Sequence, residues 1–266
     1  MWMLALDFEW DTVWRYLWHP LIREGAWITL QVAVLAQIVG VVLGTVLAVL
    51  GRGRNPVARG FTGVYVWLFR GTPVLLQLFI LYFGVPRFFD EPRLTQELTA
   101  FRAAIIAFGL NEAAYMSEII RSGILSVEGG QMDAAKSLGM TQLRAMRHIV
   151  LPQAMRVVVP PTGNEFIAML KNTSLASVIG LNELLLRSRA IYAVNFDILE
   201  LLFVAALWYL AFTTIFSLLQ AELERALAIA DRERPTTILS RMIEIMGGRR
   251  GVVWDGSGRP PTMGAE

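Results

Sequence analysis

ITLQVAVLAQIVGVVLGTVLAVL, residues 28–50, decides the fold class, because its 23 residues include no charged side chain. As an α-helix this stretch would be about 35 Å long, which is enough to cross the hydrocarbon layer of a membrane. Small residues recur at every fourth position and share one helix face: Ala36, Gly40, Gly44 and Ala48. Such a face lets another helix, of this chain or of a second subunit, approach closely in lipid. We therefore expect a membrane protein whose first span packs through these small residues.

The composition of the whole chain supports this class. Of the 266 residues, 55% are hydrophobic and 17% are charged, and the mean hydropathy is +0.50, which is too apolar for a single soluble core. The chain has no cysteine, and His19 and His148 stand too far apart to suggest a histidine cluster, so no metal site is predicted. The basic residues lie mostly beside the apolar runs, as membrane orientation requires, and we predict no nucleic-acid partner.

Four further apolar runs bring the expected number of spans to about five, which makes the fold class an all-α membrane protein. The second run begins at Asn55-Pro56, a typical helix start, and is interrupted by Arg70-Gly71-Thr72-Pro73. It is either one kinked helix or an interfacial helix followed by a spanning helix that Thr72 and Pro73 cap. An arginine at mid-membrane costs about 2.5 to 3.5 kcal/mol, so we expect Arg70 to reach water, headgroups or a partner and to anchor the structure rather than contact a substrate.

The third span is expected over residues 98–122, the fourth after Pro152 and the fifth over 198–219. Pro160-Pro161 and Gly163 are expected to break the fourth span. Polar residues on broken spans often mark transport sites, because such residues are tolerated where they line a cavity or face another helix. We therefore predict a substrate path formed by Glu112, Tyr115, Asn164, Glu165, Lys171, Asn172, Thr173 and Ser174. On the third span, Glu118 and Arg121 are three residues apart and are expected to pair.

The distribution of Lys and Arg predicts the orientation. The short loop after the first span holds Arg52, Arg54 and Arg59 and no acid, and such residues are enriched in cytoplasmic loops. With an odd number of spans, this places the N-terminus outside and the C-terminus in the cytoplasm. The stretch between spans three and four is then cytoplasmic.

That cytoplasmic stretch, GGQMDAAKSLGMTQLRAMRHIVLP at residues 129–152, looks like part of a soluble protein. Asp133 is expected in the first turn of a short helix, where its charge complements the helix dipole, and Gly139 is expected to end that helix. Thr141 should cap a second helix that runs toward Ile149 and stops at Pro152. From the residues alone, this insert could couple a soluble partner to the transmembrane path or could be a re-entrant loop.

The spacing within the insert resembles the EAA signature of ABC importer permeases. Asp133-Ala134-Ala135 is followed after three residues by Gly139, after nine more by Ile149, and after one more by Leu151-Pro152, with Asp where Glu is usual. FRGTP at 69–73, GQ at 130–131 and LKNTSLASVIGLNEL at 170–184 resemble the polar amino acid (histidine/glutamate/glutamine/arginine/opine) permeases of this group. The likeness covers about residues 25–225.

The resemblance implies a type I ABC importer permease fold with cytoplasmic coupling helices between spans three and four. Such permeases reside in the bacterial cell membrane and form a homodimer or a pair of related subunits. They work with two ABC ATPase subunits and an extracytoplasmic solute-binding protein, and they import a polar amino acid by alternating access. The residues that carry over to ATPase coupling are Gly130, Gln131, Asp133, Ala134, Ala135, Gly139, Ile149, Leu151 and Pro152. The Asp-for-Glu change shortens one of these contacts.

The chain itself is not expected to be an enzyme. It has no GxxxxGK[ST] stretch, so ATP and Mg²⁺ are expected in the partner ATPase and no cofactor is expected in this chain. A zwitterionic substrate needs a cation for its carboxylate and an acid or carbonyls for its ammonium. Lys171, Asn164 and Thr173 could serve the first need, and Glu165, Glu112 and Tyr115 the second. Alternatively, Glu165 and Lys171 belong to an interhelical network.

The expected organisation is an extracytoplasmic segment over residues 1–25, a permease domain over 26–222 with its coupling loop at 128–150, and a mobile cytoplasmic tail over 223–266. Two other classes share some of these features. A passive channel or secondary transporter would have polar broken spans but would not need the EAA-like insert. A membrane scaffold would need the insert but not the polar interior. A membrane-embedded enzyme lacks support, because the sequence shows no recognisable nucleophile and base or metal constellation.

Overall fold

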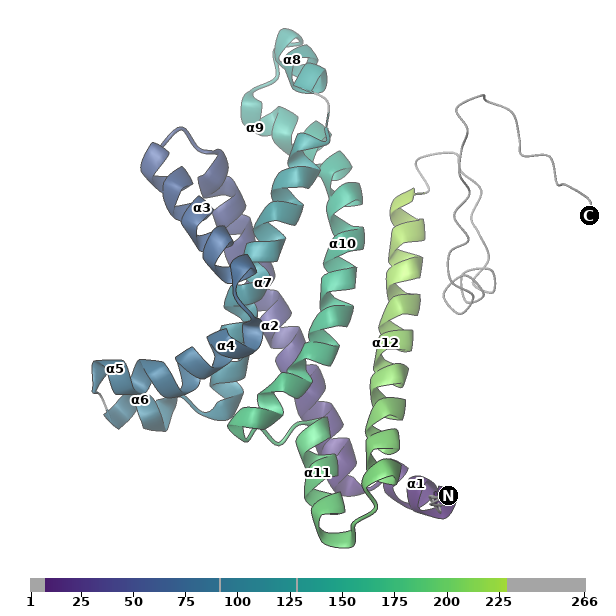
Figure 1. The fold of residues 1–266 in the computed structure, drawn as a ribbon. Coiled ribbons are helices and arrows are strands. Elements are labelled where there is room, and N and C mark those ends of the chain that lie inside the picture. Colours follow the sequence, from purple (N-terminus) through teal and green to yellow (C-terminus); the bar gives the residue numbers. More distant parts are fainter. Residues whose placement is uncertain (1–7, 91, 128, 229–266) are drawn as a thin grey trace, which may run out of the picture. The chain divides into compact units, whose positions relative to one another are not determined.

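The computed structural model describes residues 8–90, 92–127 and 129–228, and this part of the chain is helical and contains no strand (Figure 1). The predicted tail lies outside the described residues from 229 onward. Elements η1 and η2 are π-helical, and η3 is a 3₁₀ helix. In chain order the elements are α1 (Trp10–Leu17), α2 (Pro20–Arg52), α3 (Pro56–Gly71), α4 (Val74–Phe79), η1 (Ile80–Gly84), α5 (Val85–Phe89), α6 (Pro92–Glu97), α7 (Ala100–Leu125), α8 (Gly129–Ser137), α9 (Gln142–Ala145), η2 (Met146–Val150), α10 (Leu151–Asn172), η3 (Thr173–Ile179), α11 (Leu184–Asn195) and α12 (Ile198–Ala228).

The long helix α2 packs against α7 through the small-residue face that the sequence predicts. All four small residues of this face are buried. A Cβ added to Gly40 would clash with the side chain of Glu112, and a Cβ added to Gly44 would clash with that of Met116. The two backbones can approach this closely only because glycine has no side chain. The prediction is confirmed, and the partner is a helix of the same chain.

The second apolar run is a pair of helices that meet at a sharp bend. Asn55 caps α3, as predicted, because its Oδ1 accepts from Val57 N at 2.9 Å. At the other end, α3 and the helical stretch Val74–Phe89 are bent by 104°, so the run is not a single gently kinked helix. The predicted cap by Thr72 is wrong: its hydroxyl donates backward to Leu68 O at 2.8 Å.

Proline chemistry explains where the bend lies. Pro73 has no N–H, so it cannot donate to Phe69 O as a continuing helix would require. Two side-chain amides supply the missing donors, Gln77 Nε2 at 2.9 Å and Asn111 Nδ2 at 2.9 Å from Phe69 O. Gln77 Nε2 also donates to Thr72 O at 3.1 Å. The bend is therefore held by polar contacts that an apolar surrounding would not replace.

Two short helices, α8 and α9, form the predicted insert at one end of the bundle (Figure 1). Gly139 ends α8 with a φ of 79°, and Met140 N donates to Ala135 O at 3.0 Å, which is a Schellman ending. Thr141 caps α9 by accepting from Arg144 N. Both predictions are confirmed. The predicted place of Asp133 is wrong, because α8 begins at Gly129 and Asp133 lies beyond its first turn.

The predicted stop at Pro152 is also wrong. α9 continues through η2 into α10, and Pro152 lies in the first turn of α10. A proline inside a helix lacks one N–H and crowds the carbonyl four residues before it. The wider π-helical turn of η2 lies just before this proline, where such a turn accommodates the irregularity.

Likewise, α10 is one continuous helix and is not broken at Pro160-Pro161. α12 lies beside this part of α10, and Gln220 Nε2 donates to Pro160 O at 3.0 Å. Gly163 leaves the space that the Gln220 side chain occupies. The missing N–H groups of Pro160 and Pro161 leave the carbonyls of Arg156 and Val157 without their helical donors. Prolines are tolerated inside membrane helices when the surroundings accommodate such carbonyls.

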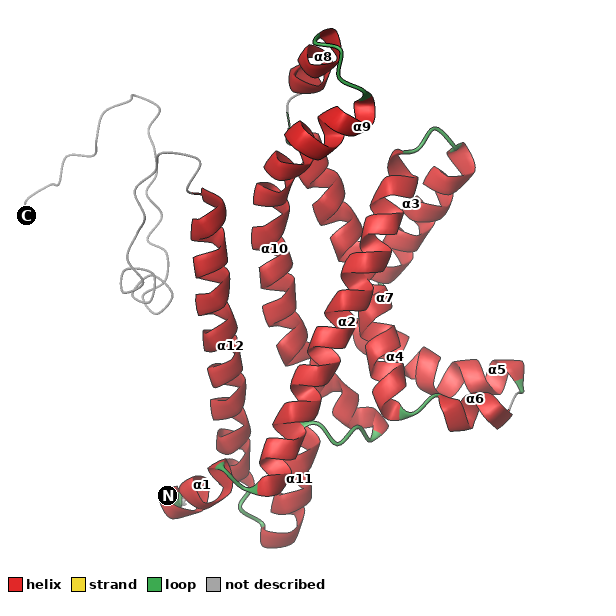
Figure 2. Cartoon of the chain, turned by 180° about the vertical axis from the view of Figure 1, so that it is seen from behind, coloured by secondary structure: helices red, strands yellow, loops and turns green. Residues whose placement is uncertain are grey.

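Among the described residues, three helices are long and apolar enough to cross a membrane: α2, α7 and α12 up to Leu227. The bent pair that begins with α3 raises the number to four. α10 is not among them, because Arg156, Asn164 and Glu165 interrupt its apolar residues. The total of five spans therefore stays a prediction. Figure 2 shows the short loops that connect helices in the described part of the chain.

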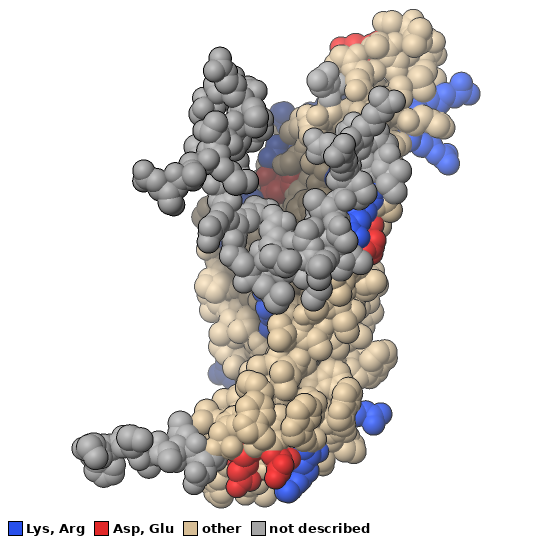
Figure 3. All heavy atoms as spheres, turned by 90° about the vertical axis from the view of Figure 1, so that its right-hand side faces the viewer, with Lys and Arg blue, Asp and Glu red and all other residues tan. Residues whose placement is uncertain are grey.

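Two apolar cores hold the helices together. The larger core joins α2, α4, α7, the end of α10 and η3, with Phe108 and Leu170 fully inside it. The smaller core joins α1, the start of α2, α11 and α12, around Ile22 and Leu201. The face shown in Figure 3 carries a broad band of uncharged residues, with acidic and basic side chains together at the end near α1 and α11.

Candidate functional site

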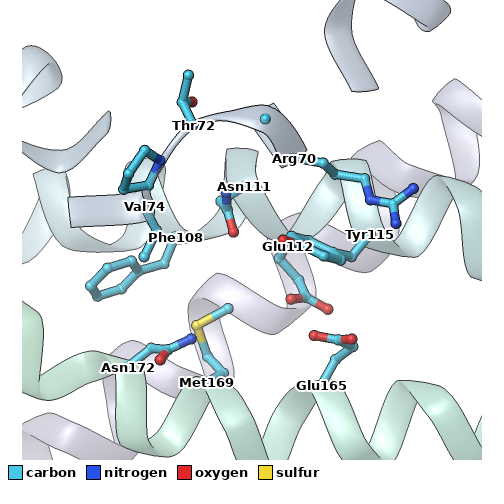
Figure 4. Close-up of a pocket in the computed structure, with 12 residues that line it drawn as sticks. Arg70, Thr72, Val74, Phe108, Asn111, Glu112, Tyr115, Glu165, Met169 and Asn172 are labelled. Carbon is cyan, nitrogen blue, oxygen red and sulfur yellow. The ribbon is translucent and has the colours of Figure 1, made fainter. Parts of the chain in front are cut away.

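A cavity of about 470 Å³ lies where α3, α4, α7 and α10 meet. Pockets of roughly 300 to 1,000 Å³ hold small organic ligands. The bend between α3 and α4 forms one wall, α7 the second and α10 the third (Figure 4). The lining residues are Arg70, Gly71, Thr72, Pro73, Val74, Phe108, Asn111, Glu112, Tyr115, Glu165, Met169 and Asn172.

Two carboxylates point toward one another across this cavity, Glu112 from α7 and Glu165 from α10 (Figure 4). Glu112 is buried, with 3% of its surface exposed, and Gln37 Nε2 donates to its Oε1 at 3.2 Å. Gly40 of α2 gives the Glu112 side chain its space. The Glu112 carboxyl group is thus fixed from behind by α2 and faces Glu165. The sequence did not predict this role for Gln37.

One cation, Arg70, lies at the same cavity. Its guanidinium carbon lies 5.3 Å from the centroid of the Tyr115 ring, within the range of a cation–π contact. None of the ion pairs found in the described residues involves Arg70. Its guanidinium donors therefore remain available to a ligand. Arg70 thus reaches a partner, as predicted, and it also lines the cavity. Its role as an anchor rather than a substrate contact stays a prediction.

The bend supplies the polar edge of the cavity. Asn111 Nδ2 donates to Gln77 Oε1 at 3.0 Å as well as to the free carbonyl of Phe69. This leaves the Asn111 carbonyl oxygen as an acceptor. Because the same amides hold the bend, the position of Arg70 and Thr72 depends on contacts with α7.

The structure brings together only part of the predicted substrate path. Glu112, Tyr115, Glu165 and Asn172 line the cavity, whereas the other four predicted residues do not. Asn164 faces α12 and accepts from Gln220 Nε2 at 3.2 Å, and Lys171 is exposed. Thr173 is fully buried and donates to Leu170 O at 2.8 Å, and Ser174 donates to Lys171 O at 2.7 Å. Glu118 pairs with Arg121 at 2.8 Å, as expected.

Sequence reasoning missed several lining residues, of which Arg70, Thr72 and Asn111 are polar. The available signal was the cost of an arginine inside an apolar run, which demands a polar surrounding. An arginine, two carboxylates and amide groups around one cavity can bind an ion that carries both charges. The ionisable side chains that line the cavity in the described residues include two carboxylates and one guanidinium.

The predicted coupling residues lie on the α8–α9 insert and the helix that follows it. Asp133, Ala134 and Gly139 are exposed, whereas Ala135 is buried. Gln131 accepts a hydrogen bond from Gln153 of α10, which ties α8 to the start of that helix. Ile149 is partly buried, and Leu151 and Pro152 are exposed. Leu138 and Leu143, which the sequence reasoning did not select, are 84% and 78% exposed.

Comparison with known proteins places the chain in a family. Residues 40–229 match the family model of the binding-protein-dependent transport system inner membrane component. The arginine transport system permease protein ArgU of Corynebacterium glutamicum is 42% identical over 254 residues, which cover 92% of this chain and 79% of ArgU. The glutamine transport system permease protein GlnP of Escherichia coli K12 is 34% identical over 224 residues, which cover 84% of this chain and 100% of GlnP.

The fold is shared with solved transporters. A crystal structure of an amino acid ABC transporter with histidines is similar with a TM-score of 0.75 and 35% identity, over 84% of this chain and 100% of that chain. An inward-facing MetNI methionine ABC transporter is similar with a TM-score of 0.62 and 17% identity, over 78% of this chain and 96% of that chain, which shows the fold alone. The all-helical architecture is that of a type I ABC importer permease. The chain therefore belongs to the family of binding-protein-dependent transport system inner membrane components.

Proposed function

We propose that this chain is the permease subunit of an ATP-driven importer for a polar amino acid that carries a net positive charge. The observation that carries the proposal is the pair of facing carboxylates, Glu112 and Glu165, beside a single arginine. Two like charges that face each other in a partly buried cavity repel one another. A ligand with two cationic groups would relieve that repulsion more fully than a zwitterion with one.

Each charged group of such a ligand has a matching group in the cavity. Arg70 can bind the α-carboxylate with two parallel hydrogen bonds, since its guanidinium forms no ion pair in the described part of the chain. Glu112 and Glu165 can accept from the α-ammonium and from a cationic side chain. Tyr115 and Phe108 offer aromatic surface to the aliphatic part. This replaces Lys171, Asn164 and Thr173 as the proposed partners of the carboxylate.

One of the two relatives agrees with this class of substrate, and the other points to a second class. ArgU is described as an arginine transport permease and GlnP as a glutamine transport permease. Arginine has the net positive charge that the cavity favours, whereas glutamine is a neutral zwitterion. A neutral polar amino acid is therefore the second candidate, and its supporting observation is the similarity to GlnP.

Energy for transport would come from partner subunits. In our proposal the α8–α9 insert docks on one of two cytoplasmic ABC ATPases, which bind ATP and Mg²⁺, and the exposed side chains of Leu138 and Leu143 enter the ATPase surface. The continuous helix from α9 to α10 reaches the wall of the cavity that holds Glu165. Movement of the insert would therefore be transmitted directly to that wall. A second permease subunit and an extracytoplasmic binding protein complete the importer, with the N-terminus outside and the C-terminus in the cytoplasm.

The experiment is uptake into vesicles that contain the chain with its ATPase subunits and its binding protein. We expect uptake of labelled arginine or lysine only when ATP is enclosed in the vesicles, on the same side of the membrane as the ATPase domains. Uptake of glutamine or glutamate should be small. ATP-dependent uptake of glutamine alone would keep the importer function and exclude the cationic substrate. Flux that continues without nucleotide would exclude the importer and favour a passive channel.

A further inference from the structure

Three tryptophans form an exposed stripe at the N-terminal end of the described chain. Trp10 and Trp14 belong to α1 and Trp18 follows it, and they are 56%, 64% and 66% exposed. At about 100° per residue, Trp14 lies about 40° and Trp18 about 80° around the helix axis from Trp10. The three indole rings therefore share one side. Large aromatic side chains on the surface of a protein mark an interaction site when they are contiguous.

The opposite side of α1 is fixed to the bundle. Thr12 and Val13 are buried, and Val13 belongs to the core shared with α11 and α12. Two polar contacts add to this packing: Glu9 N donates to Glu200 Oε1 at 3.2 Å, and Trp208 Nε1 donates to Leu17 O at 2.9 Å. The stripe therefore cannot turn inward without losing these contacts.

The remaining residues of α1 are arranged in layers around the stripe. Asp11 and Arg15 are exposed and lie about 100° and 140° from Trp10, on one shoulder of the stripe. Leu17 lies on the opposite edge of the stripe, about 20° beyond Trp10 around the helix axis, and contacts the apolar core. A section through the helix thus passes from charged residues through tryptophan to apolar residues. Because Leu17 faces the protein core, exposed apolar surface beside the stripe must come from a neighbouring helix. Exposed indole rings are typical of a membrane interface, where they settle between water and hydrocarbon.

The neighbouring helix α12 provides apolar surface beside the tryptophan stripe. Trp18 stacks edge-on against Trp208 of α12 with ring centroids 5.5 Å apart. Next to the α1 contact, α12 exposes Leu199, Leu202 and Phe203. α1 lies across the end of the bundle, at the start of the spanning helix α2 and opposite the α8–α9 insert (Figure 1). The stripe is therefore continuous with an exposed apolar surface of a helix long enough to span the membrane.

From these observations we infer that α1 is an interfacial lipid-binding helix. It lies in the plane of the membrane, with its tryptophans at the boundary between phospholipid headgroups and acyl chains and with Asp11 and Arg15 toward water. Amphipathic helices of this kind are buried by about 5 to 10 Å. The lipid contact would fix the ends of α2 and α12 that α1 holds together. This inference does not depend on the substrate of the cavity.

The natural absence of cysteine makes the test direct. Trp14→Cys and Arg15→Cys variants of the full chain, assembled with its partners in vesicles of phosphatidylethanolamine and phosphatidylglycerol, would each carry one nitroxide label. We expect the label at position 14 to be relaxed mainly by oxygen, which dissolves in the acyl region, and the label at position 15 mainly by a water-soluble nickel complex. Both variants should retain substrate uptake, because neither position lines the cavity.

Two results would overturn the inference. Equal accessibility of both labels to the nickel complex would place α1 in water. A label at position 14 that neither reagent reaches would show that a protein surface covers the stripe. Brominated phospholipids give a second measurement: they should quench the tryptophan fluorescence of the parent chain more than that of a Trp10→Phe/Trp14→Phe variant.

Discussion

Glu112 of α7 and Glu165 of α10 direct their carboxylates at one another across a single cavity, and Arg70 lies at its edge (Figure 4). Gln37 and Gly40 of α2 fix the first of these carboxylates from behind. Two carboxylates beside one arginine leave an excess of negative charge in the cavity, which a cationic ligand or a bound proton can offset. The arrangement links the packing of α2 and α7 to the chemistry of transport.

Replacing Gly40 with alanine should disturb this link. The added methyl group would clash with Glu112, and overpacking of this kind costs about 1 to 3 kcal/mol. We expect a lower apparent Tm of the purified complex and weaker substrate binding. Gly60→Ala is the matched control, because nothing lies within 4 Å of a Cβ at that position. Equal Tm values for the two variants would contradict the close approach of α2 and α7.

Replacing Gln77 with leucine should weaken the bend between α3 and α4. The variant loses the donor to the carbonyls of Phe69 and Thr72, and an unsatisfied buried carbonyl costs about 1 to 3 kcal/mol. We expect a lower apparent Tm and reduced uptake, because Arg70 would no longer be held. Gln142→Leu on the exposed surface of α9 is the control for Tm. An unchanged Tm in Gln77→Leu would show that other donors hold the bend.

Two substitutions at Gly139 should distinguish the effect of its positive φ from the effect of adding a side chain. The φ of 79° at this position is strained for a β-branched residue, so Gly139→Val should distort the end of α8. We expect it to uncouple ATP hydrolysis from uptake or to prevent assembly with the ATPase, with membrane insertion intact. Gly139→Asn, which tolerates a positive φ, should be milder. Normal transport by Gly139→Val would contradict the coupling role of the insert.

Two asparagines of α10 should differ in their effect on the substrate. Asn172 lines the cavity, whereas Asn164 contacts Gln220 of α12. Asn172→Ala should weaken substrate binding by several-fold, and Asn164→Ala should leave binding unchanged while lowering the apparent Tm. Equilibrium binding of labelled arginine to the purified complex checks both variants. Weaker binding in Asn164→Ala together with unchanged binding in Asn172→Ala would indicate that the substrate contacts the other face of α10.

The sequence predicts local features of this fold well. The small-residue face of α2, the cap at Asn55, the Schellman ending at Gly139 and the cap at Thr141 all follow from side-chain size or from hydrogen bonds within a few residues. The continuation of the helix through Pro152 and through Pro160-Pro161 could not be predicted from such local features. It depends on a π-helical turn before Pro152 and on the tertiary packing of α10, where Gln220 of α12 contacts the proline segment.

The same error affected the predicted site. A broken α10 would not separate its polar residues by angle, whereas a continuous helix does. In a continuous helix, Met169 and Asn172 lie within about 40° of Glu165, whereas Lys171 lies about 120° away and Asn164 about 100° away. Only the first set lines the cavity. Arg70 was missed as a lining residue because its position depends on a bend that contacts α7 stabilise.

The most direct test of the opposed carboxylates is the binding of labelled arginine and labelled glutamine to the purified complex without its binding protein. Arginine should bind more tightly than glutamine. Glu112→Gln and Glu165→Gln should each weaken arginine binding at least about tenfold, equal to about 1.4 kcal/mol, and reduce the preference over glutamine. Glu118→Gln, on the same helix as Glu112 but paired with Arg121, should change neither. Unchanged arginine binding in both cavity variants would contradict the proposed site.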